Sequence, residues 1–256
     1  MSNTKIKCHL LSDLHLEFFN NYQETSFFNL LKSQVEKDEP EFAILAGDIT
    51  NFSDPKEAQR DMQSLISLYG KVVYVPGNHE FYGNKIETGA KVLRELKDLH
   101  KDKLILLDND SVSFVGHNWV GGTMWFPKGA SYVQKGYLND FRRIADAEPD
   151  IYERHDDFVF NTIPMFTKDC IVVTHHLPFP ESIDERYKKD WLNIFFMYDC
   201  TKHLKKTEIP KMWFHGHTHH PCSYTTTDGI VVKCNPKGYL NENSNNDFFQ
   251  NLLVTI

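Results

Sequence analysis

The chain has 256 residues, of which 41% are hydrophobic and 25% are charged, so it is long enough to bury a full hydrophobic core. Its formal net charge of −7 at pH 7 argues against general nucleic-acid binding and against attachment to an anionic membrane, because both need a basic surface. Purely apolar runs are only a few residues long, which argues against a membrane span, and the N-terminal sequence lacks the long apolar stretch of a secretory signal.

The first half of the chain alternates strand-like and helix-like segments. Short continuous apolar runs predict strands at residues 5–11, 41–46, 71–75 and 103–107. Between them, apolar residues at helical spacing predict helices at residues 22–37, 55–69 and 84–101. The second of these helices has a clear start, because Asp54 and Pro55 supply an N-cap and a proline at the first helical position. This order of elements is typical of an α/β domain.

The second half of the chain is richer in strands. Apolar runs predict strands at residues 111–115, 169–175, 211–215, 229–234 and 251–256, with one helix at residues 150–167. Residues 126–149 and 176–190 are predicted to be irregular, and loops of this length often carry function. No shift in composition marks a linker, so we expect a single domain over residues 1–256.

The cysteines indicate the setting of the protein. There are five of them, an odd number, and none forms a C-x-x-C pair. This usage favours a reducing environment, so we expect a cytoplasmic protein. Nothing in the sequence implies an obligate protein partner.

Five of the predicted strands end in side chains that can bind a metal ion. The segment LLSDLHLEFF places Asp13 and His15 two positions apart, and alternate residues of an extended chain point the same way. Ligands of open α/β sheets bind at the carboxyl ends of the strands, so we expect these side chains to converge. The candidate ligands are Asp13, His15, Asp48, Asn78, His175, His217 and His219.

Seven candidate ligands are too many for one tetrahedral zinc ion. They suit two metal ions bridged by one carboxylate and by a water or hydroxide. Carboxylate, amide and imidazole ligands without a thiolate favour Mn, Fe or Zn. Gly47, Gly77 and Gly216 lie just before or between the candidates, where a strand must turn sharply. His176 is an alternative to His175 as the ligand, and we prefer His175 because it directly ends its strand.

The ordered motifs DLH, GD, GNHE, H and GHTH span residues 13–219. They resemble the pattern of the calcineurin-like metallophosphoesterase superfamily, which is D-x-H, G-D, G-N-H-[DE], H and G-H-x-H. The segments SDLHLE, THHLP and NPKGY further resemble a bacterial and phage branch of small single-domain members. The protein Ser/Thr phosphatase branch continues the second motif towards Asp-Arg-Gly, whereas this chain has residues 49–51 as Ile-Thr-Asn, which argues against a dedicated protein phosphatase.

The resemblance implies an α/β fold of two packed mixed β-sheets flanked by helices. It implies a metal-dependent phosphoesterase, in which a metal-bridging hydroxide attacks a phosphate mono- or diester of a small nucleotide or a similar phosphorylated substrate. The implied ligands are Asp13, His15 and His219 for the first metal ion and Asn78, His175 and His217 for the second, with Asp48 shared. His79 would face the phosphate, where it would stabilise the developing charge or protonate the leaving oxygen.

Other side chains are candidates for substrate contact. Besides Asn78 and His79, these are His176, Asp140 and Arg143. The segment LNDFRRI, residues 138–144, either binds a phosphate or orients His79, or it forms a solvated basic turn. Trp125 either lies in the core or stacks against substrate. The alternative function is a catalytically silent member of the same fold that binds a metal ion, a nucleotide or a protein, and the retained His79 and ligand set favour the enzyme.

Overall fold

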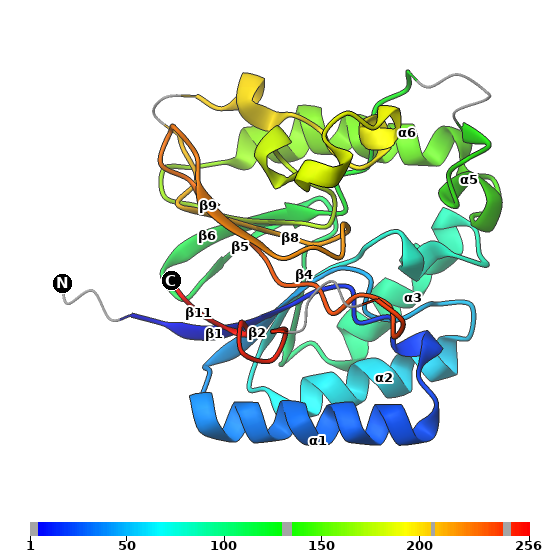
Figure 1. The fold of residues 1–256 in the computed structure, drawn as a ribbon, viewed down its shortest axis with the longest axis vertical. Helices are drawn as coiled ribbons and strands as arrows, with labels where there is room; N and C mark the ends of the chain where they lie inside the picture. The colour runs from blue at the N-terminus through cyan, green and yellow to red at the C-terminus, as the bar shows by residue number, and fades with distance from the viewer. Residues whose placement is uncertain (1–4, 130–134, 206–207, 243–246) are drawn as a thin grey trace.

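The computed structural model describes residues 5–129, 135–205, 208–242 and 247–256. Two β-sheets pack face to face, and helices cover the outer face of each sheet (Figure 1). Helices α1 and α2 lie below one sheet in this view, and α6 lies above the other. The expected α/β architecture of two packed mixed sheets flanked by helices is confirmed.

The first sheet contains five strands in the order β11-β1-β2-β3-β4. Strands β1 to β4 are parallel, and the edge strand β11 is antiparallel to β1. The strands are β1 (Lys7–Leu11), β2 (Phe42–Ala46), β3 (Val72–Val75), β4 (Leu104–Leu106) and β11 (Leu253–Thr255). The helices that connect the parallel strands are α1 (Asn21–Asp38), α2 (Pro55–Leu68) and α3 (Ile86–Leu99). Helix α2 begins where the sequence predicts, because the Asp54 side chain accepts hydrogen bonds from the backbone N–H groups of Lys56 and Glu57.

The second sheet contains six strands in the order β5-β6-β7-β8-β10-β9. Its two outer pairs are antiparallel and its inner pairs are parallel. The strands are β5 (Asp110–Phe114), β6 (His117–Gly122), β7 (Ile171–Thr174), β8 (Met212–His215), β9 (Cys222–Thr225) and β10 (Val231–Cys234). Strands β6 and β9 are not predicted from the sequence.

The remaining helices are short. Helix α5 (Asp140–Arg143) and the first residues of α6 (Ala147–Asp157) fall in a segment predicted to be irregular. The predicted helix at residues 150–167 continues past α6 only as a π-helical turn (Phe158–Thr162) and a 3-10 turn (Ile163–Met165). Other 3-10 turns are Leu16–Phe18, His79–Phe81, Pro180–Ser182, Glu185–Tyr187, Trp191–Phe195 and Cys200–His203.

Alternate residues of the strands face different parts of the core. On β2, Ile44 packs between the two sheets with Phe214, whereas Leu45 packs against the helical layer with Leu31 and Leu65. This packing fixes the two sheets against each other and brings the loops after their strands together. The carbonyl of His175 accepts a hydrogen bond from the N–H of Gly216, and the carbonyl of Gly47 accepts one from the N–H of Asp13. In the described part of the chain, no helix combines the length and apolar character needed to cross a membrane.

Candidate metal centre

The candidate ligands converge through unusual backbone conformations. Asp13, His15, Asp48, His217 and His219 all have positive φ angles, between 48° and 77°. Strand β1 ends before Asp13, so the alternation of an extended strand does not bring Asp13 and His15 together, contrary to our expectation. Left-handed turns at Asp13 and His15 bring the two side chains together instead. Such conformations are disfavoured for residues other than glycine and cluster at functional sites, where the surrounding structure enforces them.

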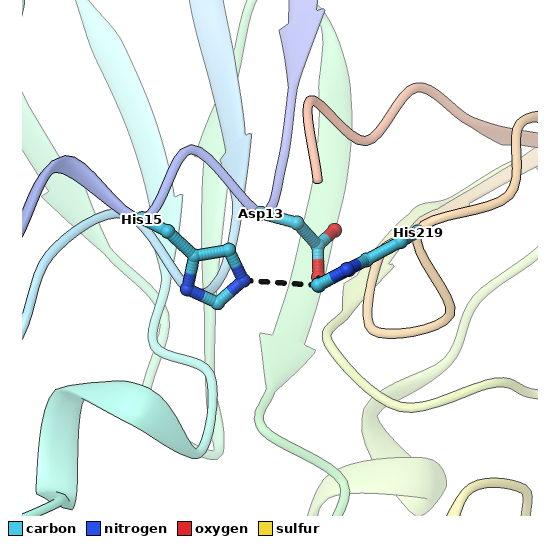
Figure 2. A group of neighbouring side chains, drawn as sticks. All are labelled: Asp13, His15 and His219. Atoms are coloured by element: carbon cyan, nitrogen blue, oxygen red, sulfur yellow. Dashed lines mark hydrogen bonds and ion pairs between the residues drawn. The ribbon is translucent and has the colours of Figure 1, made fainter. Parts of the chain in front are cut away.

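The first group of ligands joins segments that are far apart in the sequence. Figure 2 shows the side chains of Asp13, His15 and His219 pointing toward one another. The Nε2 atoms of His15 and His219 are 2.9 Å apart, and Nε2 of His219 lies 3.6 Å from Oδ1 of Asp13. The three side chains therefore face a common point, as the ligands of one cation would.

The second ring nitrogen of each of these histidines faces a carboxylate. Nδ1 of His219 lies 2.6 Å from Oε2 of Glu242, and Nδ1 of His15 lies 3.4 Å from Oε1 of Glu17. Because an ionised carboxylate can only accept, each Nδ1 atom carries the hydrogen, and Nε2 is the ring atom left to bind a cation. The 2.9 Å between the two Nε2 atoms places both within reach of one ion. A carboxylate behind a ligating imidazole is also the usual second partner of a metal-binding histidine.

The second group lies at the carboxyl ends of β2, β3, β7 and β8 and consists of Asp48, Asn78, His175 and His217. Nε2 of His175 lies 3.0 Å from Oδ1 of Asn78 and 3.3 Å from Oδ1 of Asp48. Nδ1 of His217 lies 3.1 Å from the same Nε2 atom. Nδ1 of His175 donates its hydrogen to the carbonyl of Ala46 at 2.9 Å, which leaves its Nε2 facing Asn78 and Asp48.

Asp48 lies between the two groups. Its Oδ2 is 3.9 Å from Nε2 of His15, and its Oδ1 is 3.3 Å from Nε2 of His175. Burial raises the pKa of Asp48, but the rings of His175 and His79 outweigh burial and hold that pKa well below its usual value. Burial lowers the pKa of His175, but the charge of the Asp48 carboxylate outweighs burial and raises that pKa to about 10. An ionised carboxylate that stabilises positive charge on its neighbours this strongly would stabilise a divalent cation for the same reason, and Asp48 faces both ligand groups.

His79 lies beside both groups. Its Nδ1 is 3.1 Å from Oε1 of Glu17, and its Nε2 is 3.1 Å from the hydroxyl oxygen of Tyr239. Its backbone N–H donates to Oδ1 of Asp48 at 2.9 Å. Burial lowers the pKa of His79, but the carboxylates of Asp48 and Glu17 outweigh burial and raise that pKa above its ordinary value. The ring is therefore able to hold a proton near neutral pH.

Glu80, the last residue of the GNHE motif, ties two ligand-bearing loops together. Its buried Oε2 accepts hydrogen bonds from the N–H groups of Gly77 at 2.8 Å and Asp48 at 3.1 Å. Its Oε1 accepts from the N–H of Ile49 at 2.8 Å and from the hydroxyl of Tyr74 at 2.8 Å. The carboxylate thus fixes the loop after β2 against the loop after β3, which positions the backbone of Asp48.

Two glycines leave room for the ligands. Gly47 has a φ of 84°, and a Cβ on this residue would lie 2.6 Å from Cγ of His175. A Cβ on Gly216 would lie 2.7 Å from Oδ2 of Asp13. Any larger residue at these positions would push a candidate ligand out of place.

Asp140 contributes differently from our expectation. Its Oδ1 accepts hydrogen bonds from Nδ2 of Asn78 at 2.8 Å and from the hydroxyl of Tyr82 at 2.7 Å. With its amide nitrogen engaged, Asn78 turns its Oδ1 toward His175. Asp140 therefore positions a candidate ligand rather than His79, and its negative charge does not suit phosphate binding.

His176 does not join its neighbour His175 in the ligand group. It is 1% exposed, its Nδ1 lies 3.0 Å from the carbonyl oxygen of Thr123, and its ring centre lies 4.2 Å from that of His217. Burial and the charge of His175 lower the pKa of His176 to about 3, which keeps its ring neutral. The neutral, buried ring of His176 packs behind His217, and His176 is not among the described residues that line the cavity beside the metal centre.

Arg143 and Trp125 also lie outside the described lining of the cavity next to the metal centre. Arg143 is exposed at the end of α5, and the described residues that line the cavity next to the metal centre include Asp140 but not Arg143. The phosphate contact of Arg143 therefore stays a prediction that this cavity does not support. Trp125 is 1% exposed and packs in the core against Phe81 and Phe126, so it is not a stacking platform.

A cavity of about 410 Å³ opens beside the two ligand groups. Its inner end is lined by Asp48, Asn78, His79, His217 and His219. Its outer walls come from residues 137–140 and 177–196, which fall largely within the two segments predicted to be irregular. The long loops therefore shape the space in front of the metal centre.

Sequence reasoning assigned no role to several residues that contact the centre. Glu17 and Tyr239 lie in the segments SDLHLE and NPKGY, and a carboxylate two positions after His15 is a usable signal. Glu80 lies inside the GNHE motif. Glu242 lies in a polar loop that offers no signal, and only the folded chain brings it to His219.

Comparisons with known proteins agree with these features. The sequence model described as calcineurin-like phosphoesterase matches residues 6–221 of this chain. An uncharacterized protein of Acanthamoeba polyphaga mimivirus is 28% identical over 263 residues, which cover 92% of this chain and 92% of the relative. An uncharacterized metallophosphoesterase of Helicobacter pylori is 28% identical over 126 residues, or 48% of this chain and 31% of the relative.

Solved structures share the fold at low sequence identity. The chain is similar to a phosphopantetheinyl hydrolase from Mycobacterium tuberculosis, with a TM-score of 0.69 and 14% identity over 98% of this chain and 96% of the other. It is also similar to a dimetal phosphatase from Danio rerio, with a TM-score of 0.50 and 12% identity over 90% of this chain and 86% of the other. These likenesses show the arrangement of the sheets and helices.

Proposed function

Because the chain belongs to the calcineurin-like phosphoesterase family, we propose that it hydrolyses a phosphate ester at a centre of two metal ions. One observation carries this proposal. In each ligand group, ring nitrogens and carboxylate or amide oxygens of the kinds that bind metal ions converge to within 2.9 to 3.3 Å of one another. A cation placed among these atoms would be contacted by several of them at once.

The donor atoms indicate which ions would fit. Asp13, His15 and His219 would hold the first ion, Asn78, His175 and His217 the second, and Asp48 both. Carboxylate, amide and imidazole donors suit Mn, Fe or Zn. When bound, two such ions would polarise the phosphoryl oxygens and activate a water for attack on phosphorus.

The protein's own side chains would complete the chemistry. His79 lines the cavity and holds a proton near neutral pH, so it would stabilise negative charge on the phosphoryl group or protonate the leaving oxygen. Glu17, which contacts Nδ1 of His79, and Tyr239, which contacts Nε2, would hold the His79 ring in place. Glu242 and Asp140 would orient the ligands His219 and Asn78.

The size of the cavity favours a small phosphorylated substrate over a polymer. A volume of about 410 Å³ accommodates one phosphoryl group and a small organic part. The acidic composition favours the same interpretation, and a cytoplasmic location remains part of the proposal. His79 faces this cavity beside a full ligand set, which favours catalysis over a silent member of the fold.

Hydrolysis of p-nitrophenyl phosphate and of bis-p-nitrophenyl phosphate with added Mn²⁺ tests the proposal. We expect turnover of at least one ester, its loss after chelation, and a rate at least about 100-fold lower for Asp48→Asn, because removing the shared charge should displace the ions. Metal binding with neither ester hydrolysed would favour the silent alternative. Absence of metal binding would contradict the proposed centre.

A further inference from the structure

The walls of the cavity differ in character from its inner end. Among the described residues that line it, none is a lysine or an arginine. The walls are instead largely apolar and aromatic, and include Tyr137, Leu138, Ile183, Tyr187, Leu192 and Phe196. Within the described part of the chain, the positive charge of the cavity would therefore come from the metal ions and from the histidines beside them.

Besides Asp140, whose Oδ1 accepts from Asn78 and Tyr82, the wall carries the carboxylates of Asp184 and Asp190. Asp184 is compensated, because its Oδ2 lies 2.8 Å from Nη2 of Arg186 and 3.2 Å from Nδ1 of His220. Asp190 accepts a hydrogen bond from the N–H of Leu192 at 2.8 Å, and no ion pair to it is present in the described part of the chain. The described side chains that line the wall therefore carry a net negative charge, opposite to that of a phosphate-binding surface.

Hydrogen bonds hold the wall in place, and its residue Phe196 lies close to the metal centre. The ring centre of Phe196 is 4.7 Å from that of the candidate ligand His217. The carbonyl of Phe196 accepts a hydrogen bond from the N–H of Leu177 at 3.0 Å, and Nδ2 of Asn193 donates to the carbonyl of Tyr187 at 2.7 Å. The ring of Phe196 therefore joins the wall to the metal centre.

We propose that this wall is a subsite for the organic part of the substrate, and that it selects esters with a single phosphoryl group and a flat, apolar part that is uncharged or cationic. The inference rests on the proposed function. A second phosphate, as in nucleoside di- or triphosphates or oligonucleotides, would lie beside Asp190 without a cationic partner and would be repelled. An aromatic group would instead bury its faces against Phe196 and Tyr187.

Three aryl phosphates that differ only at the far end of the ring test the charge preference. They are phenyl phosphate, 4-(aminomethyl)phenyl phosphate and 4-carboxyphenyl phosphate, assayed with Mn²⁺. We expect kcat/KM for the carboxy ester to be at least about tenfold below that for the aminomethyl ester. Equal values, or a preference for the carboxy ester, would overturn the inference while leaving the proposed hydrolysis intact.

Variants of Asp190 test whether the wall causes the preference for the aminomethyl ester over the carboxy ester. Asp190→Lys is expected to reverse the ratio between the aminomethyl and carboxy esters, and Asp190→Asn to reduce it. Asp199→Asn is a matched control, because Asp199 also caps a short 3-10 turn, accepting from the N–H of Thr201 at 3.0 Å, but does not line the cavity. A ratio that responds equally to both Asn variants would count against the wall.

Binding of phosphonates tests the apolar part of the inference without turnover. By calorimetry on the Mn²⁺-loaded protein, phenylphosphonate should bind at least about tenfold more tightly than methylphosphonate. Phe196→Ala should remove most of this difference, and Phe160→Ala, which truncates an exposed phenylalanine outside the cavity lining, should not. Equal affinities for the two phosphonates in the parent protein would overturn the subsite. If neither phosphonate binds and no ester is hydrolysed, the proposed function itself fails.

Discussion

Replacing Glu80 by glutamine is expected to destabilise the fold by about 1–3 kcal/mol, although the side chains have the same size. The carboxylate accepts from the N–H groups of Gly77, Asp48 and Ile49 and from the hydroxyl of Tyr74. A glutamine offers one accepting oxygen, and its NH₂ group must face two of these donors. At least one buried N–H then loses its acceptor, and each such loss costs about 1–3 kcal/mol.

Urea unfolding of the metal-free protein at pH 8 measures this effect. Burial and the neighbouring Asp48 carboxylate raise the pKa of Glu80 to about 7, so Glu80 is ionised at pH 8. Glu87→Gln is the control, because Glu87 is exposed on α3, and it should change the free energy of unfolding by less than about 0.5 kcal/mol. If Glu80→Gln unfolds at the same urea concentration as the parent protein, the reasoning about the four donors is refuted.

Three further changes probe the centre itself. His79→Ala should lower kcat by about 10²–10⁴-fold without weakening Mn²⁺ binding in calorimetry, and a loss of metal binding would make His79 a ligand instead. Glu242→Ala should weaken Mn²⁺ binding by about 10–100-fold, because the tautomer of His219 is no longer fixed, and unchanged affinity would contradict that role. Gly47→Ala should lower the midpoint of thermal unfolding and abolish metal binding, since its Cβ would clash with His175; a variant with normal stability and affinity would show that the loop has room.

The elements with strong local signals are predictable from the sequence. Helix α2 starts at Pro55 and ends at Leu68, as the cap and the apolar spacing indicate. Strand β6 was missed because its sequence HNWVGG ends in two glycines, and β9 because the edge strand CSYT has no continuous apolar run. The helix predicted to reach residue 167 departs from α-helical geometry after Asp157, and Pro164 cannot donate the backbone hydrogen bond that an α-helix needs.

Local sequence patterns predict only part of the candidate site. Strand ends followed by Asp, Asn and His residues identify which side chains converge. The left-handed turns at Asp13 and His15 are not visible in the pattern, because these residue types also occur in extended chain. The contacts of Glu242 and Tyr239 depend on how the C-terminal segment folds back over the centre, which no local rule encodes.

Anomalous diffraction from a crystal soaked in manganese tests the central claim most directly. We predict two anomalous peaks from manganese, both in contact with the carboxylate of Asp48. One should lie among Asp13, His15 and His219, and the other among Asn78, His175 and His217. A single peak, or peaks that do not touch Asp48, would contradict a two-metal centre.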